Sequence, residues 1–307
     1  MSVTDDMPFR VPIWSRLRRQ IAGYGFLSPW LIGFFVLTLG PAMSSLYLSF
    51  TDYSLMSQPT WVGSANYAQI ASDDPRFRAA MNVTFTYVLL SVPLKLVFAL
   101  AVAVLLNKGM RGLNWFRAIF YLPSLIGGSV AIAVLWRQVF ASDGMINQVL
   151  MTLFGYEGPS WIANPSTAIY TLVALAVWQF GSSMIIFLAG LRQIPQDMYE
   201  AASIDGASRT RQFFKITLPL LTPVIFFNAV ILTIDAFKAF TPAFVISDGS
   251  GGPIDSTLFY TLYLYQEAFT NFRFGYASAL AWVLVAIIAG FTALSFLSAK
   301  YWVHYDD

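Results

Sequence analysis

The sequence predicts an all-α integral membrane protein with six transmembrane helices and a polar loop between the fourth and fifth helices. Three observations lead to this prediction. Hydrophobic residues make up 57% of the 307 residues and charged residues only 11%, and the mean hydropathy is +0.62, whereas soluble domains average roughly 45–50% apolar and 25% charged residues. Six apolar stretches are long enough to cross a membrane. Lysine and arginine residues gather on one side of these stretches.

Each predicted helix meets the length that a membrane requires, which is about 20 mostly apolar residues. The six stretches are residues 26–50, 83–106, 116–139, 168–191, 220–246 and 276–297. They divide the chain into an N-terminal tail (1–25), a first transmembrane helix with an external segment (26–81), a five-helix core (82–298) and a C-terminal tail (299–307). Because the number of spans is even, we expect both tails on the same side of the membrane.

The distribution of positive charge orients the chain, because cytoplasmic loops are enriched in lysine and arginine. One side carries 12 of the 18 such residues, namely Arg10, Arg16, Arg18, Arg19, Lys108, Arg111, Arg117, Arg192, Arg209, Arg211, Lys215 and Lys300. The other side carries Arg76, Arg78, Arg137 and Arg273. We therefore expect both tails and the polar loop in the cytoplasm. The asymmetry also accounts for the pI near 8.7, and no basic patch indicates a nucleic-acid partner.

The start of the chain and its residue inventory exclude several classes. A cleavable signal has an apolar region of about 7–15 residues; the run after residues 1–25 is longer, so we expect a retained span. Cysteine is absent, which excludes disulfides, thiol nucleophiles and cysteine-ligated metals. The single histidine, His304, lies in a polar tail, as solvated residues do. No G-x-x-x-x-G-K-[ST] phosphate loop occurs. We expect no catalytic residue, metal or cofactor in this chain.

The second and third spans contain residues that are unusual in a membrane. Lys95 lies near the centre of the second span, where a charge costs roughly 2.5–3.5 kcal/mol and normally faces the bundle interior or water. It could contact a transported solute or pair structurally with another helix. Pro123, Gly127 and Gly128 could break the third span at a buried site or allow close helix packing, and we favour packing. The external loop 141–165 could contact a soluble partner.

The fourth and fifth spans carry polar side chains. Gln179 and Ser182 are three residues apart, so they share a helix face. Asp235 and Lys238 are also three apart, and Asn228 lies seven residues before Asp235. A mutual ion pair is the least costly arrangement for the two charges. We predict that Gln179, Ser182, Asn228 and Lys238 face a substrate path, with helix packing and a structural ion pair as the alternatives.

The polar loop between spans four and five has a regular pattern. Residues 200–219 read EAASIDGASRTRQFFKITLP. The first residues favour a helix, and Gly206 can adopt the positive φ that ends one helix and turns into the next. Residues 209–216 predict a second short helix, and Pro219 suits the first turn of the helix that follows. Two short helices on one membrane surface predict a docking feature.

The spacing in this loop, E-A-A-x3-G-x9-I-x-L-P, resembles the EAA motif. In permease subunits of binding-protein-dependent ABC importers this motif forms the cytoplasmic coupling-helix loop. Every fixed position is filled here, by Glu200, Ala201, Ala202, Gly206, Ile216, Leu218 and Pro219. The resemblance implies that these residues dock a separate ATP-hydrolysing subunit. The alternative is an ordinary amphipathic loop between two spans.

Other segments resemble the sugar-type permeases of the maltose and glycerol-phosphate importers. They are WVGSANYAQI, NVTFTYVLL, FRAIFYLPSLIGG and STLFYTLYLYQEAFTNFRFGYASALA. The resemblance implies a hetero-oligomer in the lipid of a bacterial or archaeal cytoplasmic membrane. Its other members would be a second permease subunit, an ATP-hydrolysing subunit dimer and an external solute-binding protein. It also implies a sugar or oligosaccharide substrate and a motor-driven alternation between inward and outward openings.

Two other functions stay open from the residues alone. A self-sufficient secondary transporter or channel would need a coupling-ion site, for which Lys95, Asp235 and Lys238 are candidates, and it would not need a motor-docking loop. An intramembrane enzyme would need a catalytic arrangement. The spans contain no Ser/His, paired-Asp or H-E-x-x-H pattern, which makes this class the weakest.

Overall fold

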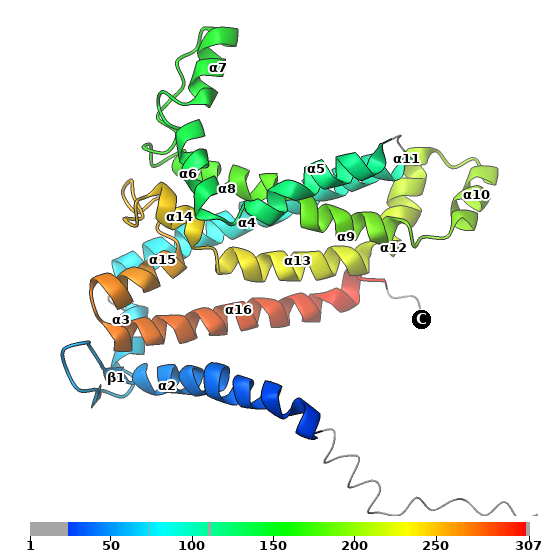
Figure 1. Ribbon diagram of the computed structural model, residues 1–307. Coiled ribbons are helices and arrows are strands. Elements are labelled where there is room, and N and C mark those ends of the chain that lie inside the picture. The colour runs from blue at the N-terminus through cyan, green and yellow to red at the C-terminus, as the bar shows by residue number, and fades with distance from the viewer. Residues whose placement is uncertain (1–23, 73, 110–111, 305–307) are drawn as a thin grey trace, which may run out of the picture.

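The computed structural model describes residues 24–72, 74–109 and 112–304, and most of this part of the chain is helical. Helices α4 (Pro75–Asn107), α13 (Thr222–Phe237) and α16 (Phe274–Trp302) run side by side through the bundle (Figure 1). Four expected cytoplasmic arginines (Arg10, Arg16, Arg18 and Arg19), Arg111 and the last three tail residues lie outside the described residues.

The two ends of the bundle carry different short elements (Figure 1). One end carries the loop between the fourth and fifth spans and the end of the described chain, with α10 (Gln196–Ile204), α11 (Arg209–Gln212), the π-helical segment η2 (Phe213–Thr217) and α12 (Leu218–Leu220). The opposite end carries β1 (Thr51–Asp52), β2 (Thr60–Trp61), α3 (Ala65–Ser72), α14 (Thr241–Ile246), α15 (Tyr260–Tyr265) and the π-helical segment η3 (Gln266–Thr270).

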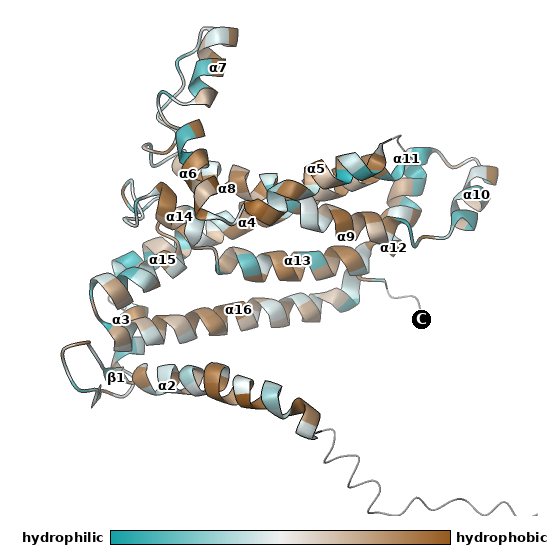
Figure 2. Cartoon of the chain, in the orientation of Figure 1, coloured by the Kyte–Doolittle hydropathy of each residue, from teal (hydrophilic) through white to brown (hydrophobic). Residues whose placement is uncertain are grey.

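The lengths of the helices fit a membrane protein. Four are long and apolar enough to span: Tyr24–Leu48, Pro75–Asn107, Thr222–Ile246 and Phe274–Trp302. Two bent pairs also qualify if each is one span, Leu113–Ile126 with Val130–Val139 and Ala168–Trp178 with Gly181–Leu191. The described chain thus has four to six candidate spans, and hydrophobic residues predominate along α4, α13 and α16 (Figure 2). The predicted all-α membrane class is confirmed.

The first span packs on the outside of the bundle. None of its most apolar residues is buried inside the chain, and its second half, α2 (Gly40–Leu48), lies against α16. A π-helical segment, η1 (Phe34–Leu39), precedes α2. Pro41 has no N–H and its ring crowds the carbonyl one turn earlier, and the wide turn just before it accommodates this.

The segment after the first span, which the sequence predicted to be external, is a small hairpin followed by α3. In the hairpin, Thr51 pairs with Trp61 in antiparallel register. Asn66 on α3 donates to the Ser49 carbonyl at 2.9 Å and to the Thr51 carbonyl at 3.0 Å. A Cβ on Gly275, at the start of α16, would lie 2.1 Å from the Thr51 carbonyl oxygen. This close approach ties the hairpin to the last span.

The third and fourth spans are each broken. Helix α5 (Leu113–Ile126) turns by 101° into α6 (Val130–Val139), and α8 (Ala168–Trp178) turns by 43° into α9 (Gly181–Leu191). Helix α7 (Met145–Phe154) follows α6 and projects away from the bundle (Figure 1). Within the bundle, α4 packs against α8, α9 and α13. The central helix thus contacts both halves of the broken fourth span.

The two breaks satisfy each other's backbone groups, as non-helical backbone at membrane depth requires. Ser124 Oγ donates to the Gln179 carbonyl at 3.0 Å and accepts from the Ser182 N–H at 3.0 Å. Gln179 Nε2 donates to the Gly127 carbonyl at 3.1 Å. A Cβ on Gly127 would lie 2.4 Å from the Gln179 side chain. Gly127 therefore serves both roles considered for it, at a helix break and at a close contact.

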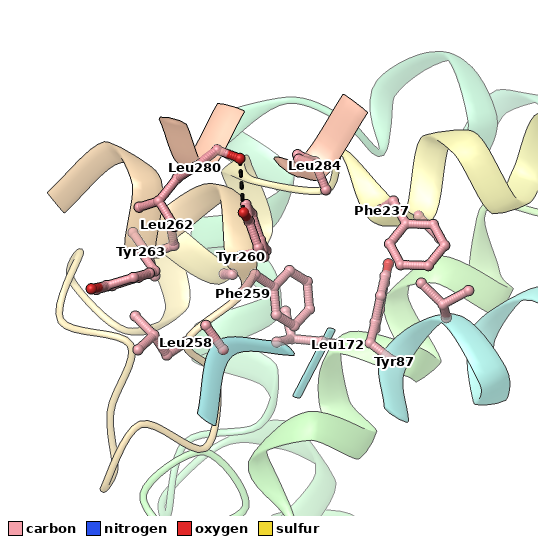
Figure 3. Packing of buried hydrophobic residues seen from close by; sticks show 14 of the residues in the cluster. Tyr87, Leu172, Phe237, Leu258, Phe259, Tyr260, Leu262, Tyr263, Leu280 and Leu284 are labelled. Atoms are coloured by element: carbon pink, nitrogen blue, oxygen red, sulfur yellow. Dashed lines mark hydrogen bonds between the residues drawn. The ribbon is translucent and has the colours of Figure 1, made fainter. Parts of the chain in front are cut away.

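Aromatic side chains fill the core between α4, α13, α15 and α16 (Figure 3). Tyr260 is fully buried. Its hydroxyl donates to the Leu280 carbonyl at 2.7 Å, and its N–H donates to Thr84 Oγ1 at 2.8 Å. Tyr87 packs against Phe259 with 4.6 Å between ring centroids. These contacts fix the part of α4 from which the candidate site is built.

Candidate functional site

The 200–219 loop contains two short helices that meet at a glycine. Helix α10 ends before Gly206, which has a φ of +74°. The Gly206 N–H donates to the Ser203 carbonyl, and the Ala207 N–H donates to the Ala202 carbonyl at 2.9 Å. These two bonds form the Schellman arrangement, which places a left-handed residue just past the helix end. Gly206 has the expected positive φ.

Side-chain hydrogen bonds hold the second helix against the first. Gln212 Nε2 donates to Ser203 Oγ at 2.9 Å and to the Ala207 carbonyl at 3.2 Å. The Tyr199 hydroxyl lies 2.9 Å from Thr217 Oγ1. Sequence reasoning missed Tyr199 and Gln212, because they fall outside the fixed positions of the motif. The signal available was their place on the two helices, from which long polar side chains can reach across a short turn.

The motif residues divide into an exposed group and a packed group. Glu200, Ala201 and Gly206 are exposed, while Ala202, Ile216, Leu218 and Pro219 are half-buried. Ile216 packs against a buried apolar cluster that includes Leu221, the residue just before α13. Two apolar residues of α10 also remain exposed, Met198 by 43% and Ile204 by 88%. The exposed face of α10 is therefore both charged and apolar, which is typical of a contact surface.

A partly open cavity of about 300 Å³ lies between the helices of the bundle. Its polar and aromatic lining comes from α4, from the two helix breaks and from the α13–α14 junction, and consists of Tyr87, Ser91, Lys95, Gln179, Asp235, Phe240 and Thr241. Apolar side chains, among them Leu172 and Leu232, complete the wall. Its volume is at the lower end of the range for small-molecule pockets. Hydroxyl, amide and charged groups beside aromatic rings can bind a polyhydroxylated solute.

The structure brings only some of the predicted path residues to this cavity. Gln179 lines it, but the helix break at Gln179 removes the continuous face that the spacing assumed. Ser182 is exposed, and its N–H bonds Ser124. Asn228 is buried, and its Nδ2 donates to the Val224 carbonyl in its own helix at 3.0 Å. Ser182, Asn228 and Lys238 are not among the residues that line the cavity.

The two charges of the fifth span form the ion pair that the sequence favoured. Lys238 Nζ lies 3.4 Å from Asp235 Oδ1, and both side chains keep more than half of their surface exposed. Asp235 also lines the cavity, as does Lys95. The sequence analysis did not predict Tyr87 and Ser91 as lining residues. They lie eight and four residues before Lys95 on the same helix, so they share its face.

A polar cluster around Asp74 lies at the opposite end of the bundle. Asp74 caps α4 by accepting the Phe77 N–H at 2.8 Å, and it accepts the hydroxyls of Tyr263 and Tyr276. Burial alone raises the pKa of the Asp74 carboxyl, but these hydrogen bonds outweigh burial, so the pKa lies below its ordinary value of 3.8. The ionised carboxylate holds α15 and α16 to the start of α4.

Two ion pairs at the same end join the loop between α14 and α15 to other helices. Arg76 on α4 bonds Asp255 at 3.1 Å, and Arg137 on α6 pairs with Asp248.

The projecting loop consists of residues 141–165 and contains α7. In it, Asn147 donates to the Ser142 carbonyl at 2.9 Å and accepts from Trp161 at 2.7 Å. The loop thus has its own small polar core. No group of three potential metal ligands occurs among the residues that the structure describes.

The chain matches a protein family over most of its length. Residues 64–303 match the family described as "Binding-protein-dependent transport system inner membrane component". This range includes the 200–219 loop, the cavity and both helix breaks.

Similar proteins include a probable ABC transporter permease protein, YesP, from Bacillus subtilis. It is 53% identical over 94% of this chain and 93% of its own length. The arabinooligosaccharides transport system permease protein AraP from Halalkalibacterium halodurans is 35% identical over 88% of this chain and 85% of its own. A chain in the crystal structure of a bacterial alginate ABC transporter, solved with an alginate pentasaccharide-bound periplasmic protein, has a TM-score of 0.81 and 21% identity. It covers 94% of this chain and 97% of its own, and it shares the fold.

Proposed function

This chain belongs to the family of binding-protein-dependent transport system inner membrane components, and from that membership we propose that it is the permease subunit of an ATP-driven sugar or oligosaccharide importer. It would work in the cytoplasmic membrane of a bacterium or archaeon. The relative whose name specifies arabinooligosaccharides supports a carbohydrate substrate. ATP hydrolysis would lie on a partner subunit, because this sequence has no phosphate loop.

The observation that carries the proposal is the shape of the 200–219 loop. It presents Glu200 and Ala201 on an exposed helix at one end of the bundle, and Gly206 with Gln212 sets the angle to the next helix. The half-buried Ile216 connects that helix to the bundle. Force applied to α10 would therefore pass through η2 and α12 into α13, which borders the cavity. We assign Glu200, Ala201, Ala202, Gly206, Ile216, Leu218 and Pro219 to docking and coupling.

The cavity is the proposed substrate path within this chain. Gln179 lines it. One N–H of its amide donates to the Gly127 carbonyl, and the second N–H and the amide oxygen remain to bond a sugar hydroxyl. Ser182, Asn228 and Lys238 stay in the proposal as residues that would face the path in another conformation. The helix breaks beside the cavity are places at which α6 and α9 could move relative to α5 and α8.

The remaining partners follow from the two ends of the bundle. A second permease subunit would cover the exposed apolar sides of residues 82–298, the five-helix core. An external solute-binding protein would meet the end that carries α7, α14 and α15, opposite the 200–219 loop (Figure 1). The division into tails, first span and core is kept as part of this proposal.

Matched substitutions in the assembled transporter test the coupling role. Gly206→Val places a β-branched residue at a φ of +74°, which such residues avoid, and Glu200→Lys reverses an exposed charge on α10. We expect normal amounts of each variant in the membrane. The copurified ATP-hydrolysing subunit should fall severalfold for Glu200→Lys, and further for Gly206→Val because the whole of α10 is misplaced.

The control is Gly155→Val. Gly155 resembles Gly206 in three ways. It has a positive φ, +63° against +74°, it follows the end of a short helix, and no atom lies within 4 Å of the Cβ that a substitution would add. It lies at the far end of the molecule, so retention of the ATPase should be unchanged. Full ATPase binding and full uptake by a Glu200→Lys, Gly206→Val double variant would contradict the coupling role and show that residues 200–219 are an ordinary loop.

A further inference from the structure

Lys95 supplies a positive charge to the cavity wall and has no close ion-pair partner in the described chain. It lies near the middle of α4, half-buried, and lines the cavity. No carboxylate oxygen of the described chain lies within 4.0 Å of its ammonium group. A cation at this depth is costly and usually has a partner or a functional role.

The carboxylate of the cavity lining, Asp235, forms its close ion pair with another lysine. Asp235 lines the cavity with Lys95, yet its carboxylate pairs with Lys238 at 3.4 Å. The lining itself carries one lysine and one aspartate. With Lys238, which lies outside the lining and pairs with Asp235, the three side chains sum to one positive charge. A neutral sugar would leave this charge without a counter-ion when it fills the cavity and displaces water.

The other polar groups are placed for the hydroxyls of the same ligand. Ser91 lies one helical turn before Lys95, and Gln179 and Thr241 line other parts of the wall. The rings of Tyr87 and Phe240 add the aromatic surface on which sugar rings pack. An acidic sugar could thus place its carboxylate at Lys95 and its hydroxyls at the remaining groups. The carboxylate would form a charge-assisted hydrogen bond with Lys95, the side chain whose charge is most costly to bury.

We propose that the cavity selects anionic sugars, those with a uronate unit, and that Lys95 is the residue that pairs with the carboxylate. This inference rests on the proposed function, in which the cavity is part of the substrate path. It adds the charge of the substrate and the residue that determines specificity.

The test uses the assembled transporter and sugar pairs that differ only at carbon 6. Glucuronate is compared with glucose, galacturonate with galactose and mannuronate with mannose, and saturation-transfer NMR measures the dissociation constants. At least one uronate should bind tenfold or more tightly than its hexose. Lys95→Met should abolish the difference, and Lys95→Arg should keep it. The matched control Lys300→Met, at a lysine outside the cavity lining, should change nothing.

A second variant carries the test if Lys95→Met fails to assemble. Asp235→Asn removes the negative charge beside the cavity, so it should tighten uronate binding severalfold without tightening hexose binding. Equal binding of every uronate and its hexose would overturn the charge inference and leave the sugar path intact. Binding of neither kind would instead overturn the assignment of the cavity in the proposed function, and with it this inference.

Discussion

Gln179 has a structural role at the cavity that is the proposed substrate path. It lies between α8 and α9, where the backbone leaves the helix, and its amide bonds the Gly127 carbonyl across to the break in the third span. The sequence predicted a polar residue in the fourth span but placed it on a continuous helix. The helix break follows from contacts with Ser124, which no spacing within the fourth span could indicate.

The contact at Gly127 predicts a difference between neighbouring glycines. In Gly127→Ala the new methyl group would lie 2.4 Å from the Gln179 side chain. Overpacking of this kind typically costs about 1–3 kcal/mol, so the thermal unfolding midpoint of the purified chain in detergent should fall clearly. Gly128→Ala is the control, because nothing lies within 4 Å of its missing side chain. Equal midpoints for the two variants would contradict the packing described here.

Asp74 predicts a pH dependence of stability. Its pKa in the folded chain is lowered below 3.8, so its contribution is fully present above that value and is lost as pH falls through the folded pKa. Compared with Asp74→Asn, the unmodified chain should unfold at a higher temperature at pH 6. That advantage should shrink below about pH 4. Thermal unfolding in detergent from pH 6 to pH 3 measures it. A constant difference across this range would show that the carboxylate does not stabilise the cluster around Asp74.

Among the elements, the broken third span was only partly predictable. Pro123 and the glycine pair indicated where a break could occur, and Ser129 begins α6 by accepting the Ile132 N–H at 3.3 Å. Hydropathy has no directional information, so the 101° turn was beyond it. The turn brings α6 against α14, and Arg137 pairs with Asp248 across this contact. These two short helices, α6 and α14, lie beside the part of the cavity wall that Gly128 and Thr241 form.

The fifth span shows a second limit of spacing. Asn228 and Asp235 are seven residues apart and were predicted on one stripe, yet Asn228 is buried against its own helix and Asp235 faces the cavity. Spacing gives the relative direction of two side chains, whereas the neighbours that cover each one depend on the packing of other helices. The ion pair of Asp235 with Lys238 was predictable because it needs no other helix.

At the scale of the whole molecule, the polar elements gather at two ends with apolar helices between them (Figure 2). The sequence predicted this division from hydropathy and charge, and the 200–219 loop lies at the same end as the described C-terminal residues (Figure 1). The loop was predictable in detail because its turn depends on local chemistry at Gly206. The cavity was not, because its wall combines α4, α8, α13 and two helix breaks.

The central claim is that an ATP-hydrolysing subunit docks on the 200–219 loop, and site-directed cross-linking tests it most directly. The chain has no cysteine, so a single Ala201→Cys can carry a photoreactive maleimide in the assembled transporter, with exposed Tyr156→Cys in the projecting loop as the control. Mass spectrometry identifies the cross-linked chain. We predict that position 201 captures a protein with the G-x-x-x-x-G-K-[ST] motif and that position 156 does not. Capture of that protein from position 156, or from neither position, would contradict the account.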